Sequence, residues 1–256
     1  MLGALLEDLR STAPDQVVVT GDLTNVSLPD EFGAARGWLE RLGDPAHVTA
    51  VPGNHDAYVS VPRERSWDLW REWLAADPEW REASDGASGF PAVRVRGPLG
   101  LVGLCSARPT LPFLATGTVG ARQLQRLERV LLALRERELV RVVLVHHAVV
   151  PGVVSARRAL RDARSLCAVL GRAGAELVLH GHLHRARIDA VPGPSGPIPV
   201  ICARSASDVG SKPEKCAQYH LVDVDGSGAG ARLSLRVRGF DPATGRFGAV
   251  GESRAL

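Results

Sequence analysis

The chain has 256 residues, of which 45% are apolar and 23% are charged, and its net charge is +3. This balance is typical of a soluble globular protein, and a chain of this length buries enough surface to fold without disulfide or metal staples. The small charge excess excludes an obvious nucleic-acid or membrane-surface protein, and no apolar run approaches the roughly 20 residues of a membrane-spanning helix.

The termini and the cysteines predict the cellular setting. The first residues lack the basic segment and cleavage site of a signal peptide. Four cysteines are present without a Cys-x-x-Cys pair, which favours a reducing compartment over a disulfide framework. We therefore expect a cytoplasmic protein, and the small charge excess adds the expectation of no nucleic-acid or membrane partner. The oligomeric state is not readable.

The first half of the chain alternates helical and strand patterns. In chain order it predicts a helix at 2–12, a short strand at 17–19, a helix at 29–43 and a second strand at 47–51. A tryptophan-rich and mostly helical stretch at 62–82 and a hairpin at 93–105 follow. Acidic residues at 30 and 31 favour the start of the second helix. The tryptophans at helical spacing are expected in the core or as a cap over the active site.

The second half begins with a proline-rich loop at 106–119. It then predicts a helix with Leu124, Leu127, Leu131 and Leu134 on one face, followed by a strand at 140–145, a helix at 156–170 and a strand at 176–179. The last third predicts strands alone, at 186–191, 198–203, 219–224 and 232–239. This pattern predicts one α/β domain over residues 1–256, in which the strands between 198 and 240 complete a second sheet packed on the first.

Four of the predicted strands stop at residue types that bind metals. The clusters are Asp22, Asn54-His55-Asp56, His146-His147 and His182-Leu183-His184. Sites in α/β sheets gather outside the carboxyl ends of strands, so these clusters can meet at one point. Carboxylate, imidazole and amide oxygen suit Mn, Fe, Zn or Ni, and two such ions can activate water and clamp a phosphate.

In order along the chain, Gly21-Asp22-Leu23-Thr24-Asn25, Gly53-Asn54-His55-Asp56, His146-His147 and Gly181-His182-Leu183-His184 resemble the motifs of calcineurin-like metallophosphoesterases. The resemblance covers about residues 1–205. It is strongest to the bacterial branch that includes cyclic-nucleotide and glycerophosphodiester phosphodiesterases. It implies a four-layer α/β/β/α sandwich with two mixed sheets and two divalent metal ions.

The resemblance also implies roles for individual residues. Asp22 is expected to bridge both metals and His55 to protonate the leaving oxygen. Asn54, His146 and His182 are expected to bind one metal, and His184 the other. His147 is the alternative to His146, and it is otherwise expected beside the ligands. Asp56 is expected to support them, and Asn25 either bonds near the site or only shapes its turn.

The sequence departs from the family pattern in one respect. The family opens with a strand ending in Asp-x-His, which supplies two ligands to the metal shared by Asp22 and His184, and no Asp-x-His occurs in this chain. We therefore expect an N-terminally truncated sequence that lacks the first strand, with about 25–60 residues encoded upstream.

Two functions follow as hypotheses. The first is hydrolysis of a phosphomonoester or phosphodiester, such as a cyclic nucleotide or another small diester, by a hydroxide bridging two metals. The second is a catalytically impaired or non-catalytic remnant that lost part of its metal site. The sequence leaves the natural substrate and the metal identity open.

Overall fold

Six strands form the central sheet of the computed structural model, which describes residues 1–86, 88–210 and 216–256. Their order is β3-β4-β5-β6-β8-β7, and their bounds are β3 Ala92–Arg96, β4 Leu99–Gly103, β5 Val140–Leu144, β6 Leu177–His180, β7 Arg187–Gly193 and β8 Gly196–Cys202. The inner strands β4, β5, β6 and β8 run parallel, and β3 and β7 add antiparallel edges. Parallel strands lie between two covered faces, and all five residues of β5 are buried, including Arg141, which pairs with Glu176.

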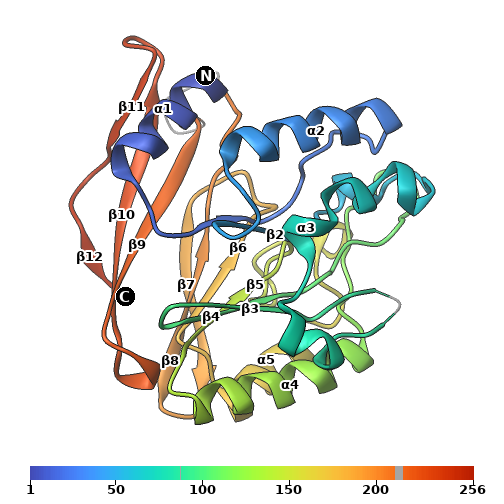
Figure 1. Ribbon diagram of the computed structural model, residues 1–256, viewed down its shortest axis with the longest axis vertical. Helices are drawn as coiled ribbons and strands as arrows, with labels where there is room; N and C mark the ends of the chain where they lie inside the picture. Colours follow the sequence, from blue (N-terminus) through green and yellow to red (C-terminus); the bar gives the residue numbers. More distant parts are fainter. Residues whose placement is uncertain (87, 211–215) are drawn as a thin grey trace.

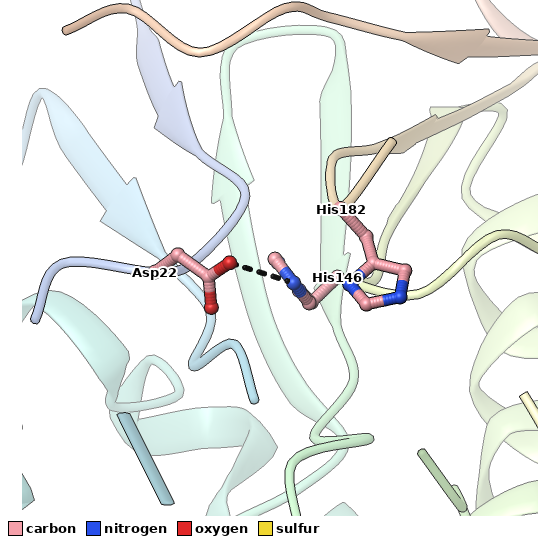
Figure 2. A group of neighbouring side chains, drawn as sticks. All are labelled: Asp22, His146 and His182. Atoms are coloured by element: carbon pink, nitrogen blue, oxygen red, sulfur yellow. Dashed lines mark ion pairs between the residues drawn. The ribbon is translucent and has the colours of Figure 1, made fainter. Parts of the chain in front are cut away.

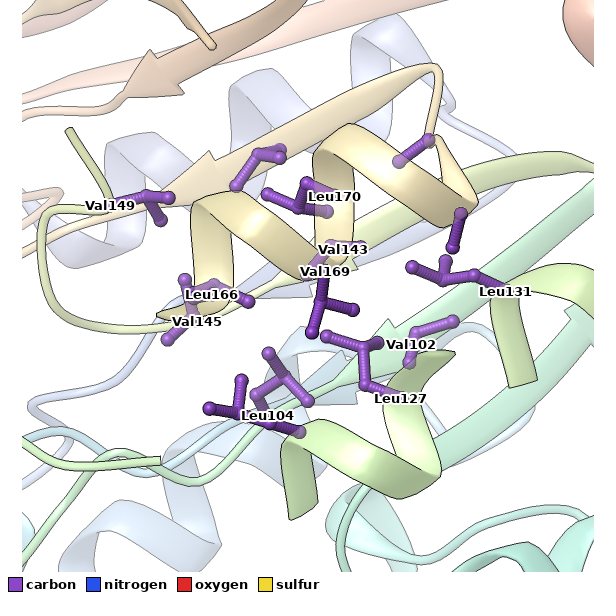
Figure 3. Packing of buried hydrophobic residues seen from close by; sticks show 14 of the residues in the cluster. Val102, Leu104, Leu127, Leu131, Val143, Val145, Val149, Leu166, Val169 and Leu170 are labelled. Carbon is purple, nitrogen blue, oxygen red and sulfur yellow. The ribbon is translucent and has the colours of Figure 1, made fainter. Parts of the chain in front are cut away.

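Two helices cover one face of this sheet (Figure 1). They are α4 (Ala121–Glu136) and α5 (Ala163–Ala173). Their apolar stripes interlock with the sheet in one cluster, in which Leu127, Leu166, Leu170 and Val143 are fully buried (Figure 3). The leucine spacing of α4 is that of an amphipathic helix lying on a core, so its sequence-based prediction is confirmed.

A second layer lies on the other face of the sheet. Strands β1 (Val17–Val19) and β2 (Val48–Ala50) form a parallel pair. Strand β10 (Arg232–Asp241) pairs antiparallel with β9 (Gln218–Asp225), β11 (Arg246–Ala249) and β12 (Arg254–Ala255). Helices α1 (Leu2–Thr12) and α2 (Pro29–Leu42) lie outside this layer, opposite α4 and α5 (Figure 1). The expected α/β class and its order of layers are confirmed.

The second layer is divided by a cavity of about 1750 Å³. Residues of β1 and of β9 line it, among them Val17, Val18 and Leu221. In the described part of the chain, β1 pairs with β2 and β9 pairs with β10, and these pairs belong to separate sheets.

The tryptophan-rich segment 62–82 forms short turns in place of a continuous helix. They are η2 Arg63–Arg65, η3 Trp67–Trp70, α3 Arg71–Leu74 and η4 Pro78–Ala83. Three indole N–H groups donate to separate carbonyls, Trp67 to Asp56, Trp70 to Phe32 and Trp73 to Gly43. Each tryptophan is thus anchored on a different element, and the backbone bends to allow it. Trp70 and Trp73 are buried, so they belong to the core.

Two other boundaries differ from the sequence-based prediction. Helix α5 begins at Ala163, because residues 156–162 form η5 (Ala156–Arg158) and a loop bound to the segment 106–119. The Asp162 carboxylate accepts the N–H groups of Val119 and Gly120 there. The strands between 198 and 240, predicted to complete one second sheet, belong to two sheets. Strand β8 joins the six-stranded sheet, whereas β9 and β10 belong to the four-stranded sheet of the second layer.

Candidate metal centre

The loops after β1, β2, β5 and β6 bring their polar residues to one place. One ligand atom from each of Asp22, His146 and His182 lies within 4.8 Å of the other two (Figure 2). The Asn54 Oδ1 atom lies 3.0 Å from His146 Nε2 and adds a fourth oxygen or nitrogen donor. The predicted convergence of these four residues is therefore seen in the structure, and it follows from the shared carboxyl-terminal edge of the strands.

His146 presents a defined nitrogen to this centre. Its Nδ1 atom lies 2.6 Å from the Thr20 carbonyl oxygen, and a carbonyl only accepts, so Nδ1–H donates to it. Its Nε2 atom faces Asn54 Oδ1 at 3.0 Å and Asp22 Oδ2 at 3.2 Å. His146 Nε2, Asn54 Oδ1 and Asp22 Oδ2 are then three acceptors in contact, so either a proton or a cation must lie among them. Burial lowers the pKa of His146, but the Asp22 carboxylate outweighs it and the net shift is upward.

His182 is oriented by a reciprocal contact with Arg158. The His182 Nε2–H donates to the Arg158 carbonyl at 3.0 Å, and the Arg158 guanidinium donates to the His182 carbonyl at 2.9 Å. The Nδ1 atom of His182 is left as the ligand atom. Burial lowers the pKa of His182 to about 3, so the ring is neutral and able to bind a metal. The backbone at His182 has φ of 70°, a left-handed turn at the end of β6.

Asp22 sits at a tight crossing of two loops. Its backbone φ is 59°, and its Oδ1 atom accepts the His55 N–H at 3.0 Å. Burial raises the pKa of Asp22, but the neighbouring His146 ring and the His55 N–H outweigh it and hold the value to about 2. Asp22 is therefore a carboxylate at neutral pH, as a metal ligand must be.

Close contacts between the two loops explain why glycine stands directly before Asp22 and before Asn54. A Cβ on Gly21 would lie 2.6 Å from the Gly53 nitrogen, and a Cβ on Gly53 would lie 2.1 Å from Asp22 Oδ1. Real Cβ atoms do not approach other atoms this closely. Gly21 also has φ of 95°, which favours glycine. The Gly-Asp and Gly-Asn pairs therefore let two ligand loops touch.

Asp56 links the same two loops through hydrogen bonds to its carboxylate. Its carboxylate accepts the N–H groups of Gly53, Asp22 and Thr24 at 2.8–3.0 Å. Burial raises the pKa of Asp56 to about 6, and the nearby Asp22 charge adds to that shift. Asp56 thus supports the ligand loops through the backbone, in line with the supporting role expected for it.

His55 lies beside the centre, and both of its ring nitrogens have hydrogen-bond partners. Its Nδ1–H donates to the Asn25 carbonyl at 2.5 Å, so its Nε2 atom is the one able to hold and release a proton. Asn25 therefore acts on His55 through its backbone. That His55 is a proton donor and Asp22 a catalytic residue stays a prediction.

Two predicted histidines lie outside the cluster. His147 is fully buried with Nδ1 2.7 Å from Ser106 Oγ, and its Nε2 has no hydrogen-bond partner among the described residues. Burial lowers the pKa of His147 well below its ordinary value. His184 is exposed, with φ of 55°, and lines the cavity beside β1. Its binding of a second metal stays a prediction.

Sequence reasoning missed two residues that contact the ligands. Arg158 orients His182, and the Tyr58 hydroxyl accepts the Asn54 Nδ2–H at 2.6 Å. Arg158 lies in a segment predicted to be helical, and Tyr58 follows its motif without any pattern of its own. The one sequence signal that could have indicated the Asn54–Tyr58 contact is their spacing of four residues, which suits a contact across a turn.

Comparison with known proteins agrees with this centre. The family described as calcineurin-like phosphoesterase matches residues 1–186, so the chain belongs to that family, whose members are phosphoesterase hydrolases. A probable cyclic nucleotide phosphodiesterase from Synechococcus sp. is 38% identical over 53 residues, which cover 21% of this chain and 20% of that protein. The chain thus matches about a fifth of that relative's length.

A solved structure shares the fold. The dimetal phosphatase from Danio rerio is 15% identical and superposes with a TM-score of 0.67, over 97% of this chain and 87% of that one. Two imidazoles, a carboxylate and an amide oxygen fit the divalent ions that such a family uses. Among the described residues, no helix combines the length and the apolar character that crossing a membrane requires.

Proposed function

We propose that this protein hydrolyses phosphate esters in a metal-dependent reaction, with small phosphodiesters as the favoured substrate class. The observation that supports the proposal is the set Asp22, Asn54, His146 and His182, whose donor atoms face one another at 3.0–4.8 Å. These four residues would hold a divalent ion. Such an ion lowers the pKa of bound water and polarises a phosphoryl oxygen.

The protein residues would divide the remaining work. The carbonyls of Thr20 and Arg158 fix the two histidine rings so that their unprotonated nitrogens face the centre. His55, with Nδ1 held by the Asn25 carbonyl, would deliver a proton from Nε2 to the leaving oxygen. General acid catalysis of this kind contributes about 10²–10⁴-fold.

The substrate class rests on a narrower observation. The segment related to a probable cyclic nucleotide phosphodiesterase supports a diester over a monoester. The centre is open to a large cavity, which leaves room for a second ester group. The proposed substrate is therefore a small diester, and bis(p-nitrophenyl) phosphate is a suitable probe.

The Asn54→Ala variant tests the proposal. It removes one ligand atom and leaves the strands intact, so turnover of bis(p-nitrophenyl) phosphate with Mn²⁺ should fall by about 100-fold or more. Gln125→Ala, on the exposed face of α4, is the control and should keep full activity. Both variants should show the circular dichroism spectrum of the parent protein.

Two results would contradict the proposal. Equal turnover in Asn54→Ala and the parent protein would show that the activity comes from elsewhere. A parent protein that binds Mn²⁺ but turns over neither bis(p-nitrophenyl) phosphate nor p-nitrophenyl phosphate would favour the non-catalytic alternative. The ratio of the two rates decides between diester and monoester.

A further inference from the structure

We propose that Tyr58 is a positioning residue that sets the orientation of both the metal ligand Asn54 and the proton donor His55. The inference rests on the proposed function. It assigns a role to a side chain outside the motif residues. One hydroxyl group reaches both partners, which come from the same loop after β2.

The contacts of Tyr58 are direct. Its hydroxyl oxygen lies 2.6 Å from Asn54 Nδ2 and 3.4 Å from His55 Nε2. Its ring lies against the His55 ring, with centroids 4.6 Å apart and planes at 56°. The backbone is fixed as well, because the Tyr58 N–H donates to Ser27 Oγ at 2.9 Å, and Ser27 in turn donates to the His55 carbonyl. The phenol is thus held at the site from its backbone to its hydroxyl.

The contact with Asn54 decides which end of the amide faces the metal position. The two ends of a carboxamide have nearly the same shape, and only hydrogen bonding distinguishes them. A phenol can donate as well as accept, but the Tyr58 hydrogen is directed at His55 Nε2, which is an acceptor because Nδ1–H is held by the Asn25 carbonyl. The phenol oxygen therefore accepts the Nδ2–H, and Oδ1 turns toward His146 Nε2. A flipped amide would present its N–H₂ to the cation and could not bind it. The Tyr58 hydroxyl therefore selects the ligating orientation of Asn54.

The contact with His55 concerns the nitrogen that would carry the proton. Since Nδ1–H is committed to the Asn25 carbonyl, the second ring nitrogen, Nε2, presents a lone pair. The Tyr58 hydroxyl lies 3.4 Å from it and can donate its one hydrogen there. The phenol oxygen then remains free to accept from Asn54, so one hydroxyl group holds both side chains in place.

The Tyr58→Phe variant removes the hydroxyl and keeps the ring against His55. We expect the Mn²⁺ dissociation constant, measured by calorimetric titration, to rise about 10-fold, as for loss of a hydrogen bond behind a metal ligand. We also expect kcat for bis(p-nitrophenyl) phosphate to fall about 10-fold with KM unchanged. A residue that only packs would change neither the Mn²⁺ affinity nor kcat.

The chain offers a matched control, because it contains two tyrosines. The Tyr219 hydroxyl donates to Asp8 Oδ2 at 2.6 Å, in a contact between β9 and α1. Tyr219→Phe removes the same atom from another partly buried hydrogen bond. It should lower the unfolding midpoint while leaving Mn²⁺ affinity and kcat unchanged.

The outcomes separate the two proposals. Parent-like Mn²⁺ affinity and kcat in Tyr58→Phe would overturn the role of Tyr58. A parent protein that binds Mn²⁺ without turning over either ester would overturn the proposed function, and the Mn²⁺ titration would still decide on Tyr58. A parent protein that binds no Mn²⁺ would overturn both.

Discussion

The two layers of sheet differ in how they are held, although both carry residues of the candidate metal centre. The six-stranded sheet carries His146 and His182 and is covered by α4 and α5, with side chains such as Leu127 and Val143 fully buried. The β1–β2 pair carries Asp22 and Asn54 on strands of three residues each. Val17, Val18 and Val19 of β1 are only partly buried beside the cavity.

This difference shows that residues of one site can stand on strands of unequal burial, because β2, β5 and most of β6 are buried whereas β1 is only partly buried. Apolar burial fixes the histidine side of the centre. Hydrogen bonds fix the other side, because the Asp56 carboxylate collects three N–H groups from the two loops. Outside the site, α1 is held on the second layer both by the ion pair between Asp8 and Arg238 and by an apolar cluster that contains Leu5 and Phe247.

The largest expected effect lies in the six-stranded layer. Leu127→Ala leaves a cavity between α4 and the sheet, so the free energy of unfolding should fall by about 2–5 kcal/mol. Urea titration followed by circular dichroism measures it. Leu132→Ala, at a partly exposed position of the same helix, is the control with a smaller loss. Equal losses in both variants would contradict the view that this face is the principal core.

A smaller effect is expected where α1 meets the second layer. Arg238 donates two hydrogen bonds of 2.6 Å to the Asp8 carboxylate. Asp8→Asn should therefore lower the free energy of unfolding by about 2 kcal/mol at pH 7. Asp225→Asn breaks an exposed pair with Arg232 and should change it by less than about 0.5 kcal/mol.

The Asp8 pair also predicts a pH dependence. Burial raises the pKa of Asp8, but the Arg238 and Tyr219 hydrogen bonds outweigh it, and the folded-state pKa lies below the ordinary value. A lowered pKa gives stability that is present above the unfolded-state pKa of about 4 and is lost as the pH falls. The difference between parent and Asp8→Asn should therefore shrink below pH 4. A constant difference down to pH 2 would contradict this assignment.

The smallest effect is expected at the cavity. Val18→Ala removes two methyl groups that are already partly exposed, so its cost should be about 0.5–1 kcal/mol. Val143→Ala removes the same groups from a fully buried strand and should cost more. Equal costs, measured by the same urea titrations, would show that the β1 face is covered in solution and would sharpen the comparison of the two layers.

Much of the fold could be predicted because its signals are local. The apolar residues of β1, β2, β5 and β6 and the leucine spacing of α4 lie within short windows. The structure has the four strands within a residue or two of their predicted bounds and a helix at the spaced leucines. The convergence of Asp22, Asn54, His146 and His182 also followed, since the ends of parallel strands share one edge.

Other features depended on contacts that no window contains. Segment 62–82 has a helical pattern, but its indole groups bond to carbonyls 11–38 residues away, which breaks the helix into turns. Helix α5 starts late because Asp162 is engaged by backbone N–H groups 42 and 43 residues earlier. Such long-range hydrogen bonds override local propensity.

The sequence by itself determined which residues can bind a metal and at which strand ends they stand, since residue type and periodicity are properties of the chain alone. Only the tertiary structure decided which nitrogen of each histidine faces the centre and which end of the Asn54 amide does. Those choices depend on single carbonyl and hydroxyl groups of Thr20, Arg158 and Tyr58, which folding brings to the ligands.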